Sequence, residues 1–191
     1  GASMKDGLHF ATNNIIVFLD GDINPYPNNT INLLTEPIFS GEADFVKSTF
    51  SRNAGRVTEL VAKPLLSIFF PELLRFSQPL SGMIAGKKTL FLQLDFRHDY
   101  GVDIGILLDM HLMNARMREI EIGYIDNKSK PWHALGKMSK EVAQTIIMKA
   151  AFSKNPNYNF EELGVLNEIR SQMEFALENH LNTLSKLIIF D

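Results

Sequence analysis

The feature that most constrains this chain is an apolar run, Ile15-Ile16-Val17-Phe18-Leu19, that ends on two aspartates separated by one glycine, Asp20-Gly21-Asp22. β-Branched and aromatic residues without interruption predict a strand over 14–19 that is buried on both faces, as in a parallel sheet covered by helices. Ligands of such sheets bind beyond the carboxyl ends of the strands. The run therefore places a ligand site directly after residue 19.

The two aspartates predict a divalent cation at this site. Alternate residues of an extended segment point the same way, so Asp20 and Asp22 can face one ion, while Gly21 lets the backbone approach a ligand closely. Carboxylate oxygens suit Mg²⁺ or Mn²⁺, and such an ion usually bridges protein carboxylates to the phosphates of a substrate.

Composition narrows the class of protein. The 191 residues are enough for one sizeable core, and 45% hydrophobic with 21% charged residues is ordinary for a globular domain. The net charge of −3, with no cluster of Lys and Arg, argues against nucleic acid as a partner. The absence of cysteine excludes disulfides and thiolate metal sites and fits a cytoplasmic protein. No apolar run approaches the 18 residues of a membrane span, so none is expected.

Strand and helix patterns alternate along the first 152 residues. We expect helices over 28–34, 56–70, 104–116 and 139–152, with Pro37 ending the first and Pro64 kinking or splitting the second. Further strands are expected at 44–49, 81–85 and 120–124. This succession predicts an α/β fold.

A boundary is expected at 153–159, where the residues are polar and turn-forming. Beyond it, apolar residues recur every three or four positions and predict one long amphipathic helix: Leu163, Leu166, Ile169, Met173, Leu177, Leu181, Leu184 and Ile188. We therefore divide the chain into a domain at 1–152 and a linker with a carboxy-terminal helix at 153–191. Packing of this helix on its own domain is favoured over packing on a partner.

Four further segments carry candidate functional groups, each with a plain structural alternative. The segment 55–59 opens a helix with a glycine, a guanidinium and a hydroxyl, which suits either a phosphate or carboxylate ligand or a surface helix cap. The segment 78–82 is a turn whose glycine permits close approach of a ligand. Asp103 lies at the amino-terminal end of an apolar helix, where it can be a helix cap or a carboxylate of the site. The loop 126–133 is either solvated or a source of metal neighbours, Asn127 and His133.

In this order the segments resemble one group of retaining glycosyltransferases, the glucosyl-3-phosphoglycerate and mannosyl-3-phosphoglycerate synthases. The resemblance covers about residues 5–150 and rests on the Asp-x-Asp strand, Gly-Arg-Val-Thr-Glu-Leu at 55–60, Gln-Pro-Leu-Ser-Gly at 78–82, Tyr-Gly-Val-Asp-Ile-Gly at 100–105 and Leu-Gly-Lys-Met-Ser at 135–139. It implies a GT-A fold with helices on both faces of the sheet. It also implies Mg²⁺- or Mn²⁺-dependent transfer of a sugar from UDP-glucose or GDP-mannose to a phosphoglycerate-like acceptor.

The resemblance also implies roles for individual residues. It assigns the donor and metal site to Asp20, Gly21, Asp22 and Gly82, with Asn127 aligned to the family's metal-binding histidine. It assigns the acceptor to Gly55, Arg56 and Thr58, the sugar pocket to Gly101 as well as Gly82, and a position near the acceptor hydroxyl to Asp103, where the family has glutamate. Met83 departs from the family, which has glutamate there, and this change removes a carboxylate from the implied sugar site.

Because few residues precede Asp20, the family's amino-terminal nucleotide-binding strands are expected to be missing, and this chain alone is not expected to transfer sugar. A homodimer or the helix at 163–188 would cover the sheet edge that those strands leave. Two alternatives remain. A haloacid-dehalogenase-type phosphatase would use Asp20 as nucleophile and Asp22 as acid, although Asn24 stands where that class has Thr or Val. A degenerate transferase-like module would bind partners through the apolar stripe at 160–189.

Overall fold

A four-stranded sheet forms the centre of the described part of the chain. The computed structural model describes residues 1–23, 25–51, 55–125 and 131–154. Within them the strand order is β1 (Ile15–Phe18), β3 (Ile84–Lys87), β2 (Phe45–Ser51) and β4 (Met117–Tyr124). β3 is antiparallel to both of its neighbours, whereas β2 and β4 are parallel. Therefore β1, β2 and β4 run in one direction and β3 runs against them.

The first strand differs from the prediction in its surroundings. β1 lies at an edge of the sheet, its partner among the described residues is the antiparallel β3, and Ile16 alone of its four residues is fully buried. The prediction of a parallel strand buried on both faces was therefore wrong. An edge strand with β-branched residues gives the same sequence pattern when its faces are partly covered by helices. The strand itself, and its end just before Asp20, were predicted correctly.

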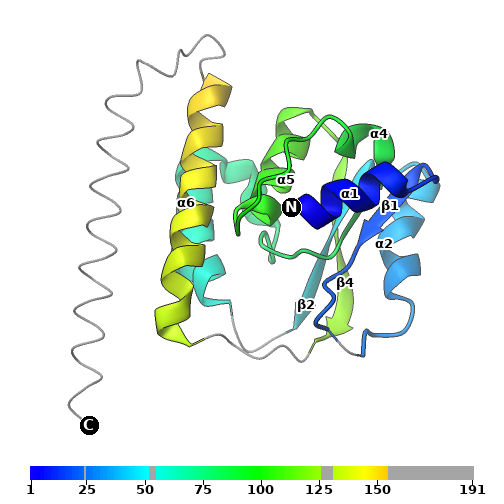
Figure 1. Ribbon diagram of the computed structural model, residues 1–191, viewed down its shortest axis with the longest axis horizontal. Helices are drawn as coiled ribbons and strands as arrows, with labels where there is room; N and C mark the ends of the chain where they lie inside the picture. Colours follow the sequence, from blue (N-terminus) through cyan, green and yellow to red (C-terminus); the bar gives the residue numbers. More distant parts are fainter. Residues whose placement is uncertain (24, 52–54, 126–130, 155–191) are drawn as a thin grey trace.

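Helices cover both faces of the sheet, as predicted (Figure 1). α2 (Thr30–Phe39) packs on one face, where Leu34 joins Val46 of β2 in one buried cluster. The other face is covered by α1 (Ala2–Phe10), α3 (Lys63–Phe69), α5 (Val102–Leu112) and α6 (Trp132–Lys154), whose apolar residues form a second cluster with Phe45. Because successive residues of a strand point to opposite faces, Phe45 and Val46 contribute to different clusters. Three short helices, η1 (Thr58–Ala62), η2 (Pro71–Arg75) and α4 (Lys88–Phe91), complete the described elements.

Several boundaries differ from those predicted. α2 continues through Pro37 to Phe39, so the prediction that Pro37 ends the helix was wrong. A proline this close to the end of a helix removes only one hydrogen bond, and burial of its ring offsets that loss. α5 stops at Leu112 because Asn114 adopts a left-handed conformation with φ 55°, and the Ala115 N–H then donates to the Met110 carbonyl.

β3 begins at Ile84 rather than at 81, because the chain before it turns with a Ser81 N–H bond to the Gln78 carbonyl. α6 begins at Trp132 rather than at Ser139. Pro131 directly before it suits a helix start, because the first N–H groups of a helix have no acceptor within the helix, and proline lacks this N–H. The carboxy-terminal end of α6 at Lys154 comes close to the predicted boundary, and the predicted linker and long helix beyond it lie outside the described residues.

The predicted irregularity at Pro64 takes the form of a π turn. In η1 (Thr58–Ala62), the N–H of Lys63 donates to the carbonyl of Thr58, five residues back, and α3 then continues the helix. A proline ring clashes with the carbonyl four residues before it in an α-helix, and the wider π turn relieves that clash. The turn lies directly after the predicted acceptor segment.

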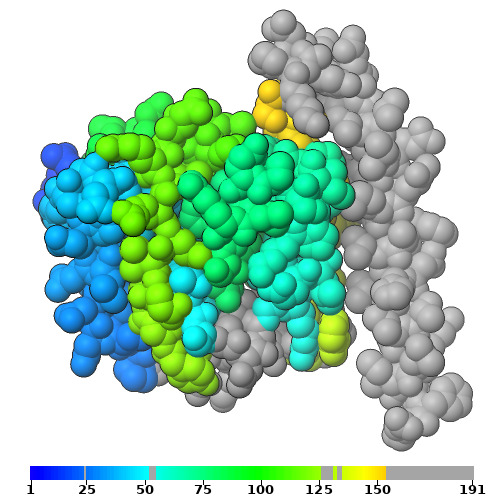
Figure 2. Space-filling view, turned by 180° about the vertical axis from the view of Figure 1, so that it is seen from behind, coloured from blue at the N-terminus to red at the C-terminus, as the bar shows by residue number. Residues whose placement is uncertain are grey.

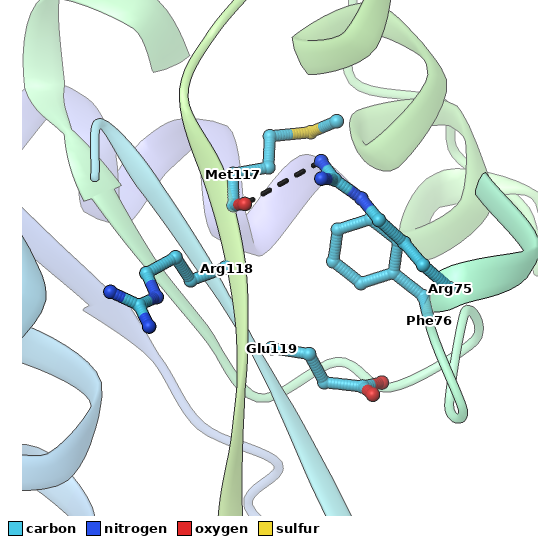
Figure 3. A pocket seen from close by; sticks show the side chains of 5 residues that line it. All are labelled: Arg75, Phe76, Met117, Arg118 and Glu119. Carbon is cyan, nitrogen blue, oxygen red and sulfur yellow. Dashed lines mark hydrogen bonds between the residues drawn. The ribbon is translucent and has the colours of Figure 1, made fainter. Parts of the chain in front are cut away.

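β4 forms the other edge of the sheet and runs over the surface between α2 and the helices at 58–75 (Figure 2). A hollow of about 200 Å³ lies beside its first residues, lined by Arg75, Phe76, Met117, Arg118 and Glu119 (Figure 3). The polar groups in it have partners: Arg75 donates to the Met117 carbonyl, and Glu119 accepts the backbone N–H groups of Ser77 and Gln78. This hollow lies by the amino end of β4, and Glu119 connects it to Gln78, the first residue of the predicted segment 78–82. No helix in the described part of the chain is both long enough and apolar enough to cross a membrane.

Candidate functional site

The direction of the strands brings the predicted segments to one edge of the sheet. Asp20 follows the carboxyl end of β1 and Gly55 follows β2, while Gly82 precedes the amino end of β3. Because β3 runs against the other strands, its amino end lies at the edge where β1 and β2 end. Ligands of open α/β sheets bind at this edge.

Asp20, Gly82 and Asp103 are in close contact. A Cβ atom at Gly82 would lie 2.5 Å from Oδ1 of Asp20 and 3.4 Å from Oδ1 of Asp103. Asp103 comes from the first turn of α5, so three elements converge here: the end of β1, the turn before β3 and the start of α5. The absence of a side chain at Gly82 is what allows the Asp20 carboxylate to occupy this position.

A fully buried lysine, Lys47 of β2, lies behind these carboxylates. Its Nζ donates to the Ser81 carbonyl at 2.7 Å and to the backbone carbonyl of Asp103 at 3.4 Å. The hydroxyls of Ser48 and Ser81 are also hydrogen-bonded, at 2.6 Å. Buried ammonium groups are rare because desolvation is costly, and carbonyl partners offset part of that cost. Lys47 therefore joins the turn before Gly82 to the start of α5.

Burial shifts the pKa values of this group of residues. Burial raises the pKa of Asp103 to about 6; the Lys47 ammonium opposes this rise and the Asp20 carboxylate adds to it. Burial lowers the pKa of Lys47 to about 8, against the attraction of the Asp103 and Asp20 carboxylates. Clustered groups with pKa values shifted by burial and by specific charges are typical of functional sites.

Tyr26 is near both aspartates of the Asp-x-Asp segment. Its hydroxyl donates to the Asp20 carbonyl at 2.7 Å, and burial together with the Asp20 carboxylate raises its pKa to about 12, with a smaller contribution from Asp22. Asp22 is exposed, and a Cβ at Gly21 would meet no atom within 4 Å. No cluster of three or more potential metal ligands of the His, Cys, Asp and Glu types occurs among the described residues. Asn127 and the side chain of His133 lie outside what the structure describes.

The predicted acceptor segment lies at the start of the helix formed by η1 and α3. Thr58 is 1% exposed, and its Oγ1 is a buried hydroxyl oxygen without a hydrogen-bond partner within the described residues. A Cβ at Gly55 would lie 3.7 Å from Cβ of Thr58. The Arg56 guanidinium lies over the ring of Trp132, 4.4 Å from its centroid. Buried hydroxyls normally have partners, so the Thr58 hydroxyl is a candidate ligand contact.

Gly101 and Met83 have clear packing roles. A Cβ at Gly101 would lie 2.0 Å from Oγ1 of Thr145, so the glycine lets the chain pass close to α6. The Gly101 N–H also donates to Asp99, which pairs with Arg97. Met83 is fully buried in the cluster on the α2 side of the sheet, where an ionised carboxylate would be costly.

Sequence inspection missed Lys47, Tyr26 and Trp132. One signal was available for Lys47, which interrupts the otherwise core-like strand sequence Phe45-Val46-Lys47-Ser48. A charged residue at a core position of a strand has to find partners, and such residues often lie at sites. No comparable signal marked Tyr26 or Trp132, because their contacts depend on the folding of loops.

Comparisons with known proteins identify relatives of this chain. The chain is 35% identical over 167 residues to glucosyl-3-phosphoglycerate synthase of Mycobacterium tuberculosis, a match that covers 78% of this chain and 51% of the relative. It is 31% identical over 163 residues to the synthase of Petrotoga mobilis, covering 78% and 50%. No family model matches.

Solved structures show the same relationship. The crystal structure of the M. tuberculosis synthase with Mn²⁺, UDP-glucose and phosphoglyceric acid superposes with a TM-score of 0.73 at 33% identity, covering 78% of this chain and 54% of that one. Another structure of that synthase contains Mg²⁺ and UDP. The chain spans about half the length of the relatives it matches. It is therefore a partial homologue of the glucosyl-3-phosphoglycerate synthases, which are glycosyltransferases, and it has a fold of their GT-A type.

Proposed function

We propose that this chain is the part of a metal-dependent glucosyltransferase that holds the diphosphate of a UDP-glucose donor and a phosphoglycerate acceptor. The observation that carries the proposal is the convergence of Asp20, Gly82 and Asp103 at the strand ends. The ligands in the crystal structures of the M. tuberculosis synthase support the choice of donor, acceptor and metal. GDP-mannose is the alternative assignment for the donor.

The residues on the donor side fit a hard divalent cation. Asp20 and Asp22 offer carboxylate oxygens on either side of Gly21, where a Cβ would meet no atom within 4 Å. Both carboxylates raise the pKa of the Tyr26 hydroxyl, which indicates that both are near it. Bound there, Mg²⁺ or Mn²⁺ would neutralise charge on the diphosphate that leaves with the nucleotide. Asn127 completes the proposed metal ligands. Gly21 leaves room for the donor, Gly82 leaves room for the Asp20 carboxylate, and Lys47 holds the Gly82 turn through the Ser81 carbonyl.

The residues on the acceptor side fit a small phosphorylated acid. Arginine at position 56 can pair with an oxyanion in a bidentate manner, and the Thr58 hydroxyl has no hydrogen-bond partner among the described residues. Gly55 precedes them at the helix start, where a Cβ atom would lie 3.7 Å from Cβ of Thr58. Asp103 would accept a hydrogen bond from the acceptor hydroxyl, and with a pKa of about 6 it is ionised at neutral pH. Gly101 would border the sugar while packing on α6. We propose that transfer retains the anomeric configuration, which NMR of the product would test.

Titration calorimetry with UDP-glucose and GDP-mannose, each with Mn²⁺, tests the donor assignment. The chain spans about half of its relatives, and its donor-side groups face metal and diphosphate. We therefore propose that binding by this chain is weak and insensitive to the base, and that the chain alone does not transfer sugar. Metal-dependent binding that is lost in Asp20→Asn is expected. Tight, base-selective binding would contradict the proposed division, and metal-independent binding would contradict the metal site.

Two further possibilities have direct tests. A homodimer is proposed as cover for the edge of β1 that no other described strand pairs with, and sedimentation analysis would report a monomer if this is wrong. A phosphatase would form an aspartyl-phosphate on Asp20, which chemical trapping detects. The synthases described above give that alternative no support. A role as an interaction module would depend on the stripe at 160–189, outside the described residues.

A further inference from the structure

Lys47 and Glu119 are neighbours across the parallel strands β2 and β4. The register pairs their Cα positions, so their side chains lie on the same face of the sheet. Burial lowers the pKa of Lys47, and the Glu119 carboxylate is one of the charges that oppose this, which indicates that the two groups are near each other. Both side chains bind backbone groups of one turn, at its two ends.

Glu119 holds the first residues of this turn, which spans residues 77–82 and is called the Gly82 turn. The half-buried carboxylate accepts the backbone N–H of Ser77 at 2.9 Å and that of Gln78 at 3.0 Å, one on each oxygen. Figure 3 shows the Glu119 side chain pointing from β4 toward this part of the chain. Hydrogen bonds to a carboxylate are stronger than those to a neutral acceptor. Glu119 therefore fixes the start of the turn relative to β4.

Lys47 holds the other end of the turn. From its fully buried position, its Nζ donates to the Ser81 carbonyl at 2.7 Å. Gly82 follows directly, and a Cβ there would lie 2.5 Å from Oδ1 of Asp20. The Asp20 carboxylate thus lies against the backbone of Gly82, so the place of that backbone limits where the carboxylate can lie.

The turn between these two supports is stiff. The Ser81 N–H donates to the Gln78 carbonyl at 3.0 Å, and Pro79 between them has a fixed φ. The Ser81 hydroxyl also accepts the Met83 N–H at 3.3 Å. A turn with these constraints moves as a unit, so a shift at Gln78 is passed on to Gly82.

We propose that Glu119 and Lys47 are a pair of positioning residues for the donor site, which hold the two ends of the Gly82 turn so that Asp20 can ligate a divalent cation beside the diphosphate. This inference rests on the proposed donor site. It adds β4 to the elements that build that site, although Glu119 itself touches neither the metal nor the donor.

Three variants separate the position of the turn from the charge of β4. Glu119→Asp keeps the charge, but its side chain is one methylene shorter and cannot reach both N–H groups from the same strand position. Glu119→Gln keeps the length but has one side-chain oxygen to accept a hydrogen bond. Glu121→Gln is the matched control, because Glu121 lies two residues further along β4 on the same face, is exposed, and accepts the N–H of the nearby Gly123.

The test measures the turn and the metal site in the same samples. Amide hydrogen exchange at Ser77 and Gln78 reports whether Glu119 holds the turn, and calorimetry with Mn²⁺ plus UDP measures the donor site. We expect both Glu119 variants to exchange these amides faster and to bind Mn²⁺ plus UDP about tenfold more weakly, the lower end of the range for groups that support metal ligands. Both should bind 3-phosphoglycerate as the wild type does, and Glu121→Gln should behave as the wild type in all three measurements.

A second comparison tests whether Lys47 and Glu119 act on the same turn. In Lys47→Met the turn has already lost one support, so adding Glu119→Gln should weaken the binding of Mn²⁺ plus UDP by a smaller factor than it does in the wild type. Because both proteins of this comparison lack the ammonium, its direct effect on the metal cancels. The same factor in both backgrounds would show that the two residues act independently and would overturn the pair.

The possible failures can be told apart. If the wild type does not bind Mn²⁺ plus UDP, the proposed function is wrong and the inference falls with it. If the wild type binds and the Glu119 variants bind equally well, or their amides exchange as in the wild type, the inference alone is overturned. It is also overturned if Glu119→Asp binds like the wild type or Glu121→Gln binds as weakly as Glu119→Gln, since charge then explains the effect. An equal loss of 3-phosphoglycerate binding would show general structural damage and overturn the positioning role as well.

Discussion

Replacing Gly82 by alanine tests whether Asp20, Gly82 and Asp103 form one site. The new methyl group would lie 2.5 Å from Oδ1 and 3.3 Å from Cγ of Asp20. Ordinary contacts begin near 3.4 Å, so the carboxylate has to retreat by about 0.9 Å, the difference between 3.4 and 2.5. Oδ1 of Asp103 lies 3.4 Å from the methyl position, already at contact distance, so it leaves the turn little room to relax.

The expected loss is larger for the metal than for the fold. Overpacking of this size costs about 1–3 kcal/mol of unfolding free energy. Metal–ligand distances tolerate only about 0.2 Å, so a carboxylate that moves much further leaves the coordination sphere. We expect Mn²⁺ affinity in the presence of UDP to fall about 10–100-fold, the range seen when groups that support metal ligands are removed.

Calorimetry with Mn²⁺ and UDP measures this affinity, and urea unfolding measures the stability of the same samples. Gly7→Ala in α1 is the control, because a methyl group there meets no atom within 4 Å. It should leave metal binding unchanged and raise stability by about 0.5–1 kcal/mol, as alanine does inside a helix. If Gly82→Ala binds Mn²⁺ as tightly as the wild type, Asp20 does not ligate the metal from the position described.

Three further outcomes are expected. Between pH 7.5 and 9.5 the unfolding free energy should rise by about 1–2 kcal/mol in the wild type but not in Lys47→Met. The pKa of Lys47 is about 8 in the folded chain and 10.5 in the unfolded chain, so over this range the unfolded chain binds more protons and a rise in pH favours the folded state. Equal urea unfolding curves of the wild type at both pH values would refute this. Pro64→Ala restores an N–H and permits α-helical geometry, so it should shift Thr58 and weaken 3-phosphoglycerate binding without lowering the melting temperature. Hydrogen bonds from Arg116 hold the pKa of Asp44 well below its usual range. The wild type should therefore have a higher unfolding free energy than Asp44→Asn above pH 4 and lose this difference as the pH falls below 4, which unfolding of both proteins at a series of acidic pH values would measure.

The candidate positions of Asp20 and Asp103 could be predicted from sequence because both residues stand at the ends of apolar runs. Asp20 ends one such run and Asp103 opens another, and strand and helix ends in this class of fold lie at the ligand edge. The direction of β3 could not be predicted, since a short apolar segment reads the same in either direction. Lys47 was missed because its partners, Ser81 and the backbone of Asp103, are distant in sequence and meet it only in the folded sheet.

The acceptor side was predicted in part. Gly55 and Thr58 are marked by the helix-start pattern, and the structure adds that the Thr58 hydroxyl is buried without a hydrogen-bond partner in the part of the chain that it describes. The contact of Arg56 with Trp132 depends on where α6 begins, and its start was predicted at Ser139. The polar residues at 126–130 suggested a loop through His133, but the helix begins already at Trp132, and its later turns pack on the core. Tertiary packing thus outweighed the local pattern.

The antiparallel direction of β3 explains how one edge of the sheet can hold both a carboxylate and the turn that supports it. A parallel β3 would bring its far end, at Lys87, to the edge where β1 ends, and the Ser81–Gly82 turn would then lie at the opposite edge. In the observed register Lys47 pairs with Ile84, so the lysine reaches the Ser81 carbonyl just before the strand begins. The donor side is therefore fixed by sheet pairing, whereas Arg56 and Trp132 are supported by helix starts.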